Sequence, residues 1–319
     1  MSIRIRLNEI LCRSTAWFRR EVFNPVVTCP AAWCFAIIWS IAIIYLVAIG
    51  RGYIALSAFC LFAILMLFCV ITVGITKAEH KPKVKLSRKR QGLLILQVVV
   101  ITIFICITLY TSLMFHGVID TRAIPVWSSI IGVFNRLGEK LLRADIVGHP
   151  ALSMANPVKY FLLPLPFLLF LGTRFSQLGF CRGRRTLSVL ALWCLIPIVL
   201  WIFQLSFGYL SFRVLGRRWL SNLLQNGFGE EFLFRGALQT RLKALLSSSW
   251  AIVIQALIFG TWHFAANFGS IGMTGSAAVI AFSIILQGTI GLVFGIIFQR
   301  TRNLLACSVI HVVANSLGI

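Results

Sequence analysis

Long apolar stretches are the feature that most constrains the fold of this 319-residue chain. A helix needs ~20 residues to cross a hydrocarbon core of about 30 Å, and lipid offers the backbone no hydrogen-bond partners, so only helices and closed barrels span it. The strands of a membrane barrel alternate apolar and polar residues over ~10-residue segments, and these stretches do not alternate. Clear apolar runs lie at about 31–50, 53–76, 93–115, 187–208, 276–298 and 303–319.

Three further stretches are shorter or carry polar residues. Residues 158–173 are broken by prolines, 220–245 contain two glutamates, and 250–267 contain His263 and Asn267. With 59% hydrophobic and 12% charged residues, the composition excludes an ordinary soluble domain. The sequence therefore predicts an all-α polytopic membrane protein with about eight or nine transmembrane helices, the catalytic core lying in the C-terminal half.

The net charge of +22 would favour nucleic-acid binding in a soluble chain. Here the basic residues flank apolar runs, where they set membrane topology, so we expect no nucleic-acid partner. If the N-terminus is cytoplasmic and nine spans alternate, 20 of the 30 Lys and Arg residues fall inside and nine outside. The outside group at 213–218 opposes this orientation. We expect an integral membrane protein with a cytoplasmic N-terminus, and the short basic loops favour a bacterial inner (plasma) membrane.

The chain divides by the placement of its polar residues. Residues 1–186 form a predicted accessory transmembrane region, since the spans at 31–115 contain no acidic residue. Within it, apolar residues recur at helical intervals over about 126–142, which predicts an interfacial helix. This helix and the basic segment 77–90 are candidate docking elements, but membrane anchoring and topology are the better explanation for both. Residues 187–319 are the predicted functional core.

Glu230 and Glu231 are two adjacent carboxylates in an apolar run, and no other acidic residue follows Asp145. An acid inside the membrane is costly and marks a functional site by default. On a helix, Glu231 and Arg235 are four residues apart in the favourable order for an ion pair. Two neighbouring carboxylates cannot both ionise cheaply, so Arg235 should hold Glu231 as an anion and leave Glu230 as a candidate general base. A purely structural pair explains this motif about equally well.

Two other apolar runs contribute polar side chains. His263 lies in one of them, with Asn267 one turn later, and by itself it would be read as a buried packing residue. In the other, the four-residue spacing of His311 and Asn315 places two donors on one helix face, as an oxyanion requires. A hydrogen bond between helices explains that second pair equally well.

Depth favours one shared site. Counting ~1.5 Å per residue from the assumed cytosolic ends, Glu230 lies roughly 22 Å into the membrane, His263 about 20 Å, and His311 about 12 Å. Three helices thus bring polar groups to similar levels, and we expect them to meet around a single water molecule.

These motifs match a known pattern. Glu-Glu-x-x-x-Arg, Phe-x-x-x-His and His-x-x-x-Asn occur in that order at Glu230, Glu231, Arg235, Phe259, His263, His311 and Asn315. The order resembles the CAAX-prenyl protease and bacteriocin-processing (CPBP, or Abi) family of intramembrane glutamic proteases, which includes the eukaryotic Ras-converting enzyme. The resemblance covers about 187–319, and residues 1–186 match nothing comparable.

The resemblance implies hydrolysis of peptide bonds in membrane-associated or C-terminally tagged substrates by a glutamate-activated water. By position, Glu230 would be the general base and His263 would help to orient the water. Glu231, fixed by Arg235, would shape the site, and His311 with Asn315 would stabilise the oxyanion. Phe259 and Asn267 would be structural supports.

Alternatives from other classes stay open. Zinc held by Glu230, His263 and His311 would give a metalloprotease, although we expect no cofactor and the chain has no His-Glu-x-x-His motif. A transporter or a peptide-binding membrane protein would also place acids and histidines at mid-membrane. The expected partners are the lipid bilayer and a membrane-associated peptide or protein whose identity the sequence does not give.

Overall fold

The computed structural model describes residues 15–76, 86–268 and 275–317, and every regular element within these ranges is a helix. Six helical segments are long and apolar enough to cross a membrane, and α14 (Ser248–Trp262) and α18 (Leu304–Asn315) are shorter apolar helices. The prediction of an all-α polytopic membrane protein is confirmed. Part of the predicted basic docking segment, residues 77–85, lies outside the described ranges.

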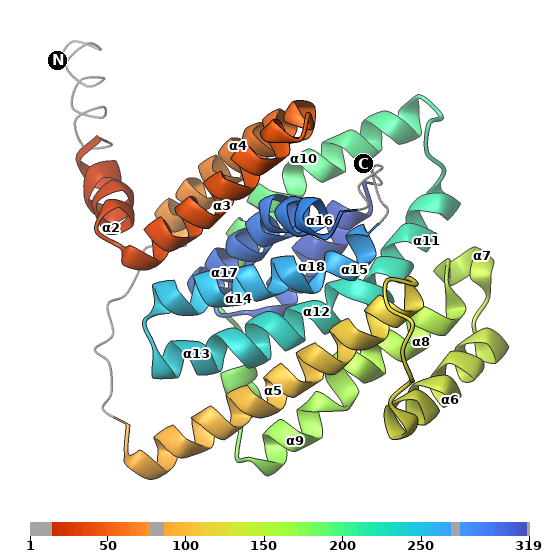
Figure 1. Cartoon of the computed structure of the whole chain (residues 1–319). Coiled ribbons are helices and arrows are strands. Elements are labelled where there is room, and N and C mark those ends of the chain that lie inside the picture. The colour runs from red at the N-terminus through yellow and green to blue at the C-terminus, as the bar shows by residue number, and fades with distance from the viewer. Residues whose placement is uncertain (1–14, 77–85, 269–274, 318–319) are drawn as a thin grey trace.

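The N-terminal part consists of long helices. The π-helical turn η1 (Arg19–Phe23) and the short α2 (Asn24–Val27) precede the hairpin of α3 (Pro30–Ala48) and α4 (Gly52–Thr76). The longest helix, α5 (Arg88–Phe115), begins at Ser87, whose side chain accepts a hydrogen bond from the Arg90 backbone N–H and so caps it. In Figure 1, α3 and α4 lie above the centre of the molecule and α5 lies below it.

The predicted interfacial helix is present as α6 (Pro125–Leu141), and it buries Trp127, Ile131 and Gly138 on one face. This face packs on α8 (Pro150–Pro157), which continues through η2 (Val158–Leu162) into α9 (Pro164–Phe170). The stretch predicted at 158–173 is therefore part of one continuous helical segment, which already begins at Pro150. The short α7 (Ala144–Val147) precedes this segment and η3 (Phe175–Leu178) follows it. Whether α6 lies on a membrane surface stays a prediction.

The glutamates lie in one long, irregular helical segment. It follows α10 (Thr186–Ser206) and runs through α11 (Phe212–Asn222), η4 (Leu223–Gly227), α12 (Gly229–Glu231), η5 (Phe232–Gln239) and α13 (Thr240–Leu245). The turns η4 and η5 are π-helical and flank the glutamates, and π-helical turns are frequent at functional sites.

The C-terminal helices pack closely because small residues face one another. After α14 come α15 (Phe264–Asn267), α16 (Ser276–Ser283), η7 (Ile284–Gly288), α17 (Thr289–Thr301) and α18. A Cβ added to Gly260 would lie 3.0 Å from the Gly288 backbone, and one added to Gly291 would lie 2.9 Å from Ala256 Cα. Small residues at such crossings let membrane helices approach closely. α14 is thereby locked against η7 and α17.

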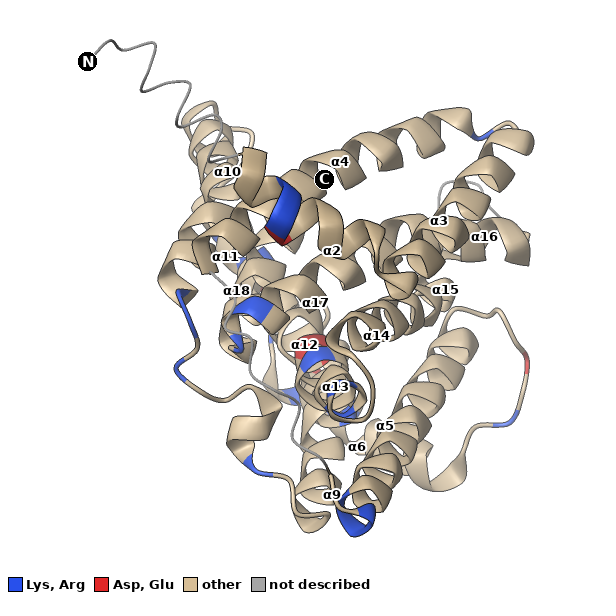
Figure 2. Ribbon diagram, turned by 90° about the vertical axis from the view of Figure 1, so that its left-hand side faces the viewer, with Lys and Arg blue, Asp and Glu red and all other residues tan. Residues whose placement is uncertain are grey.

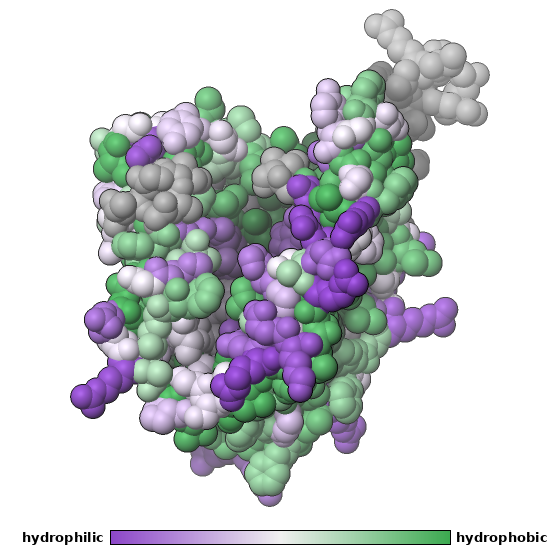
Figure 3. Space-filling model, turned by 90° about the vertical axis from the view of Figure 1, so that its right-hand side faces the viewer, coloured by the Kyte–Doolittle hydropathy of each residue, from purple (hydrophilic) through white to green (hydrophobic). Residues whose placement is uncertain are grey.

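These helices place the glutamates at the centre of the molecule. Figure 2 shows α12 near the middle of the helices, with most basic residues on turns and helix ends. Figure 3 shows the opposite end, where hydrophilic residues gather among hydrophobic ones. Helices on both sides of the predicted 186/187 boundary share one hydrophobic core, in which Tyr160 and Leu168 cluster with Phe232 and Leu233.

Candidate active site

Glu231 is the hub of the site. Its Oε1 lies 3.1 Å from Arg235 Nη1 and 2.9 Å from His311 Nδ1. Glu231 and Arg235 are both fully buried, and His311 is nearly so. The predicted i,i+4 ion pair is therefore present, and its carboxylate also joins α12 to α18. Because a carboxylate oxygen accepts, His311 Nδ1 carries the proton and donates it to Glu231.

Arg235 is a buried cation enclosed by aromatic rings. Its guanidinium carbon lies 4.4 Å from the ring centroid of Phe259 and 5.3 Å from that of Phe294. None of its three guanidinium nitrogens has a hydrogen-bond partner among the described residues. Its charge is therefore balanced by Glu231 across the 3.1 Å contact and by the two ring faces, which attract cations.

Glu230 faces His263 across a small gap. Glu230 Oε2 lies 3.8 Å from His263 Nε2, the Glu230 side chain is 6% exposed and that of His263 17% exposed. His263 Nδ1 lies 2.9 Å from the carbonyl oxygen of Phe259. A carbonyl only accepts, so Nδ1 carries the proton and Nε2 presents a lone pair towards Glu230. Two acceptors at this distance are suited to a shared donor between them, such as a water molecule.

His311 is oriented by its neighbours. Its ring stacks on Phe294 with centroids 5.1 Å apart and an interplanar angle of 20°. Since Nδ1 donates to Glu231, its second nitrogen can donate to an oxyanion only when the imidazole is protonated. The adjacent Glu231 carboxylate is the group that would stabilise that cation.

The remaining predicted residues lie at the periphery. Asn315 is the last residue of α18 and is exposed. Asn267 is buried, and its Nδ2 donates to Ser283 Oγ at 2.8 Å and Gln287 Oε1 at 3.0 Å, which ties α15 to α16 and η7. The geometry thus brings together Glu230, Glu231, Arg235, His263 and His311, gives Phe259 a backbone contact as well as packing, and leaves Asn315 on the rim.

Tyr160 is a neighbour that sequence reasoning missed. It lies on η2, in the predicted accessory region, and its ring packs against Gly229, where an added Cβ would come within 3.0 Å of the Tyr160 side chain. The ring also meets Trp262 edge-on at 5.4 Å, and Trp262 Nε1 donates to Thr108 Oγ1 at 3.0 Å. A tyrosine in an apolar run carries no sequence signal for this position, because only packing brings η2 to α12.

The alternative reading as a metalloprotease would place zinc on Glu230, His263 and His311. Among the residues that the structure describes, no three His, Cys, Asp or Glu side chains form a group that could hold a metal ion. His311 turns Nδ1 to Glu231, and His263 faces Glu230, so the imidazoles serve two different carboxylates. The side chains here do not fit a zinc site, and no step proposed below uses a metal.

Comparison with known proteins identifies the segment that holds these side chains. Residues 212–317 match the family model described as type II CAAX prenyl endopeptidase Rce1-like. The match covers about a third of the chain and includes every predicted site residue, which confirms the resemblance to the CAAX protease family. No curated protein and no solved structure matches the chain.

Proposed function

We propose, from the Rce1-like domain at residues 212–317, that this protein is an intramembrane endopeptidase in which Glu230 activates a water molecule. One observation carries the proposal. Glu230 and the unprotonated Nε2 of His263 face each other at 3.8 Å, beside a second carboxylate that is already bound to a cation. A water between them would be held by two acceptors, with its oxygen free to attack.

The reaction follows from this arrangement. Glu230 takes one proton from the water molecule, while His263 Nε2 accepts a hydrogen bond from the water's other O–H group. The water oxygen forms a bond to the peptide carbonyl carbon, whose oxygen becomes an oxyanion. Glu230 then returns the proton to the amine as the C–N bond breaks, which leaves a carboxyl and an amino terminus. General-base transfer of this kind contributes about 10²–10⁴-fold in rate.

Glu231, Arg235 and His311 would support this chemistry without attacking the substrate. Arg235 keeps Glu231 anionic, and Glu231 orients His311 through its Nδ1. A protonated His311 and the side-chain amide of Asn315 would donate to the oxyanion as it forms. Such donors contribute most when they are fixed before the reaction.

The surroundings of the site support a substrate that approaches through the membrane. The carboxylates are buried among helices, so the peptide has to reach them from the bilayer or its surface. We propose a membrane-associated peptide or protein as substrate, and a bacterial inner membrane with a cytoplasmic N-terminus as location. In a bacterial membrane, a peptide that carries its own hydrophobic segment is a better candidate than a prenylated one.

The test is the Glu230→Gln variant, with Glu139→Gln on the exposed face of α6 as the control. Cells producing the variant should accumulate uncleaved membrane peptides in a proteomic comparison, and the purified variant should lose about 10³-fold in hydrolysis, within the range of a general base. The control should behave as wild type. Unchanged peptide lengths with an altered ion flux would instead favour transport, and activity abolished by chelation and restored by zinc would favour a metalloprotease.

A further inference from the structure

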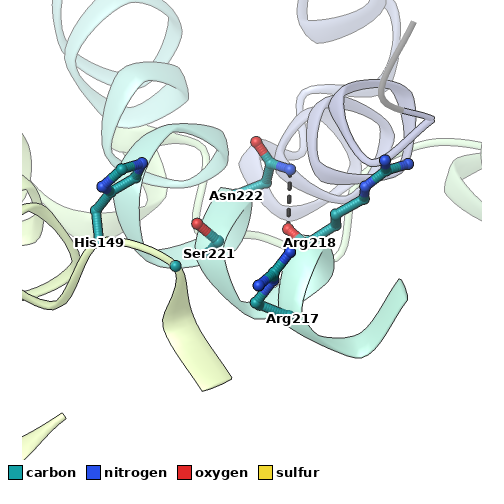
Figure 4. A pocket seen from close by; sticks show the side chains of 6 residues that line it. His149, Arg217, Arg218, Ser221 and Asn222 are labelled. Atoms are coloured by element: carbon teal, nitrogen blue, oxygen red, sulfur yellow. Dashed lines mark hydrogen bonds between the residues drawn. The ribbon is translucent and has the colours of Figure 1, made fainter. Parts of the chain in front are cut away.

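A cavity of about 350 Å³ lies at the end of the molecule that carries α6, α7 and α11. It is separate from the candidate active site. Figure 4 shows side chains from α11 and from the turn between α7 and α8 around it. The lining residues are Gly148, His149, Arg217, Arg218, Ser221 and Asn222.

The lining is cationic, with two arginines and no acidic residue. Asp145, on α7, is already engaged, since its carboxylate lies 3.1 Å from Arg143 Nε and 2.8 Å from Arg213 Nη2. The hydrogen bonds from Arg143 and Arg213 hold the pKa of Asp145 below its ordinary value. Asp145 is therefore an anion paired with other cations, and among the described residues no carboxylate pairs with Arg217 or Arg218.

Donors remain available on the cavity wall. Ser221 Oγ accepts from Gln225 Nε2 at 2.7 Å, so its own hydroxyl proton is free to be donated. Arg218 donates from Nη1 to the carbonyl oxygen of Leu317 at 3.1 Å and keeps other N–H groups. Arg217 has no ion pair among the described residues and is exposed. Guanidinium and hydroxyl donors around a cationic cavity suit a phosphate-type oxyanion.

The position of the cavity favours a lipid as the source of that oxyanion. Phe212 and Trp219 on α11 and Tyr209 just before it are exposed, and aromatic residues of this kind mark the membrane–water interface. In Figure 3, which looks onto this end of the molecule, hydrophilic residues form a patch bordered by hydrophobic ones. A phosphate bound beside such residues would be that of a lipid headgroup.

We propose that this cavity binds the phosphate headgroup of an anionic membrane lipid, with Arg217, Arg218 and Ser221 as its donors. The bound headgroup also steadies α18. Arg218 and Asn222 already reach the end of that helix, through Leu317 O and through Ser316 Oγ at 3.4 Å. The lipid would thus join α11, the α7–α8 turn and the helix that carries His311. Nothing in this proposal requires peptidase activity.

The test measures lipid binding to the full-length protein in detergent by native mass spectrometry. The probes are phosphatidylglycerol, phosphatidylcholine and inorganic phosphate. Arg217→Gln should weaken phosphatidylglycerol binding at least tenfold, and Arg217→Lys should retain most of it. The matched control Arg136→Gln, which removes an exposed charge from α6 at the same end, should stay within twofold of wild type.

Four results would overturn the proposal. Equal losses in Arg217→Gln and Arg136→Gln would show that only net charge matters. Equal affinity for phosphatidylcholine would remove the anionic requirement. Inorganic phosphate that displaces the lipid and binds as tightly would assign the cavity to a soluble anion. Loss of binding in Arg217→Lys together with a lowered unfolding temperature would reduce Arg217 to a structural residue.

Discussion

The α3–α4 hairpin and the α16–α17 segment have similarly apolar sequences, but the hairpin is mostly exposed at the surface of the protein and the α16–α17 segment is mostly buried. In the most apolar 18-residue stretch of each helical segment, 28% of α3 and 22% of α4 are buried within the protein, against 61% within Ser276–Thr301. Ile41 and Leu56 in the hairpin are 61% and 66% exposed. Lipid tails are as apolar as leucine, so a helix gains little by exchanging lipid for protein. Helices therefore pack here around polar groups, which lipid cannot solvate.

The largest loss of stability should come from the buried ion pair of Glu231 and Arg235. Glu231→Gln leaves the fully buried Arg235 without its ion partner, and breaking a buried pair from one side costs about 3–5 kcal/mol. The free energy of unfolding in detergent measures this loss. Glu21→Gln breaks the exposed Arg20–Glu21 pair instead and should cost less than about 1 kcal/mol.

A double substitution separates the effect of this ion pair on stability from its effect on hydrolysis. In Glu231→Gln/Arg235→Met the stranded cation is gone, so most of the lost stability should return while hydrolysis stays absent. A single Glu231→Gln variant as stable as Glu21→Gln would contradict the account of Arg235 as a cation held by Glu231.

A polar residue on the rim should affect only catalysis. Asn315 is exposed, so Asn315→Ala should leave the free energy of unfolding within about 0.5 kcal/mol of wild type. If its amide stabilises the oxyanion, kcat should fall about 10²-fold with little change in KM. Asn315→Asp, which keeps the shape but removes the donors, should lose as much. An unchanged kcat would remove Asn315 from the mechanism.

The same Gly→Ala substitution should have opposite effects in crowded and in open surroundings. In Gly291→Ala the new Cβ would lie 2.9 Å from Ala256 Cα, so α17 and α14 must separate, at a cost of about 1–3 kcal/mol. Gly92, in α5, has nothing within 4 Å of the same position, and Gly92→Ala should stabilise the helix by about 0.5–1 kcal/mol. Thermal unfolding of the two variants should therefore shift in opposite directions; equal shifts would show that helix propensity alone decides.

The smallest effect is expected on the lipid face of the hairpin. Leu56→Ala in α4 exchanges a side chain that is 66% exposed, and it should change the free energy of unfolding by less than about 0.5 kcal/mol. Leu46→Ala, at a fully buried position of α3, provides the contrast and should cost about 2–5 kcal/mol. Similar losses in both would mean that α4 packs against a partner on its outer face.

Much of the architecture could be predicted from local patterns. Apolar runs gave the long helices, and the predicted helix at about 126–142 is present at Pro125–Leu141. The ion pair of Glu231 and Arg235 followed from the i,i+4 spacing, which places two side chains on one helix face whatever the rest of the chain does. The predicted span at 158–173 was the least accurate, because Pro157 and Pro164 stand inside a rod that continues through them.

The order of residues alone was enough to identify a helical membrane protein with a few costly polar groups, because lipid imposes helices on any apolar run and leaves buried acids in need of partners. Which side chains become those partners depended on how distant helices pack. It turned His311 to Glu231 and His263 to Glu230, brought Tyr160 beside Gly229, and left Asn315 on the rim. These contacts join residues far apart in the chain, and their distances depend on how closely the helices pack, which no local pattern encodes.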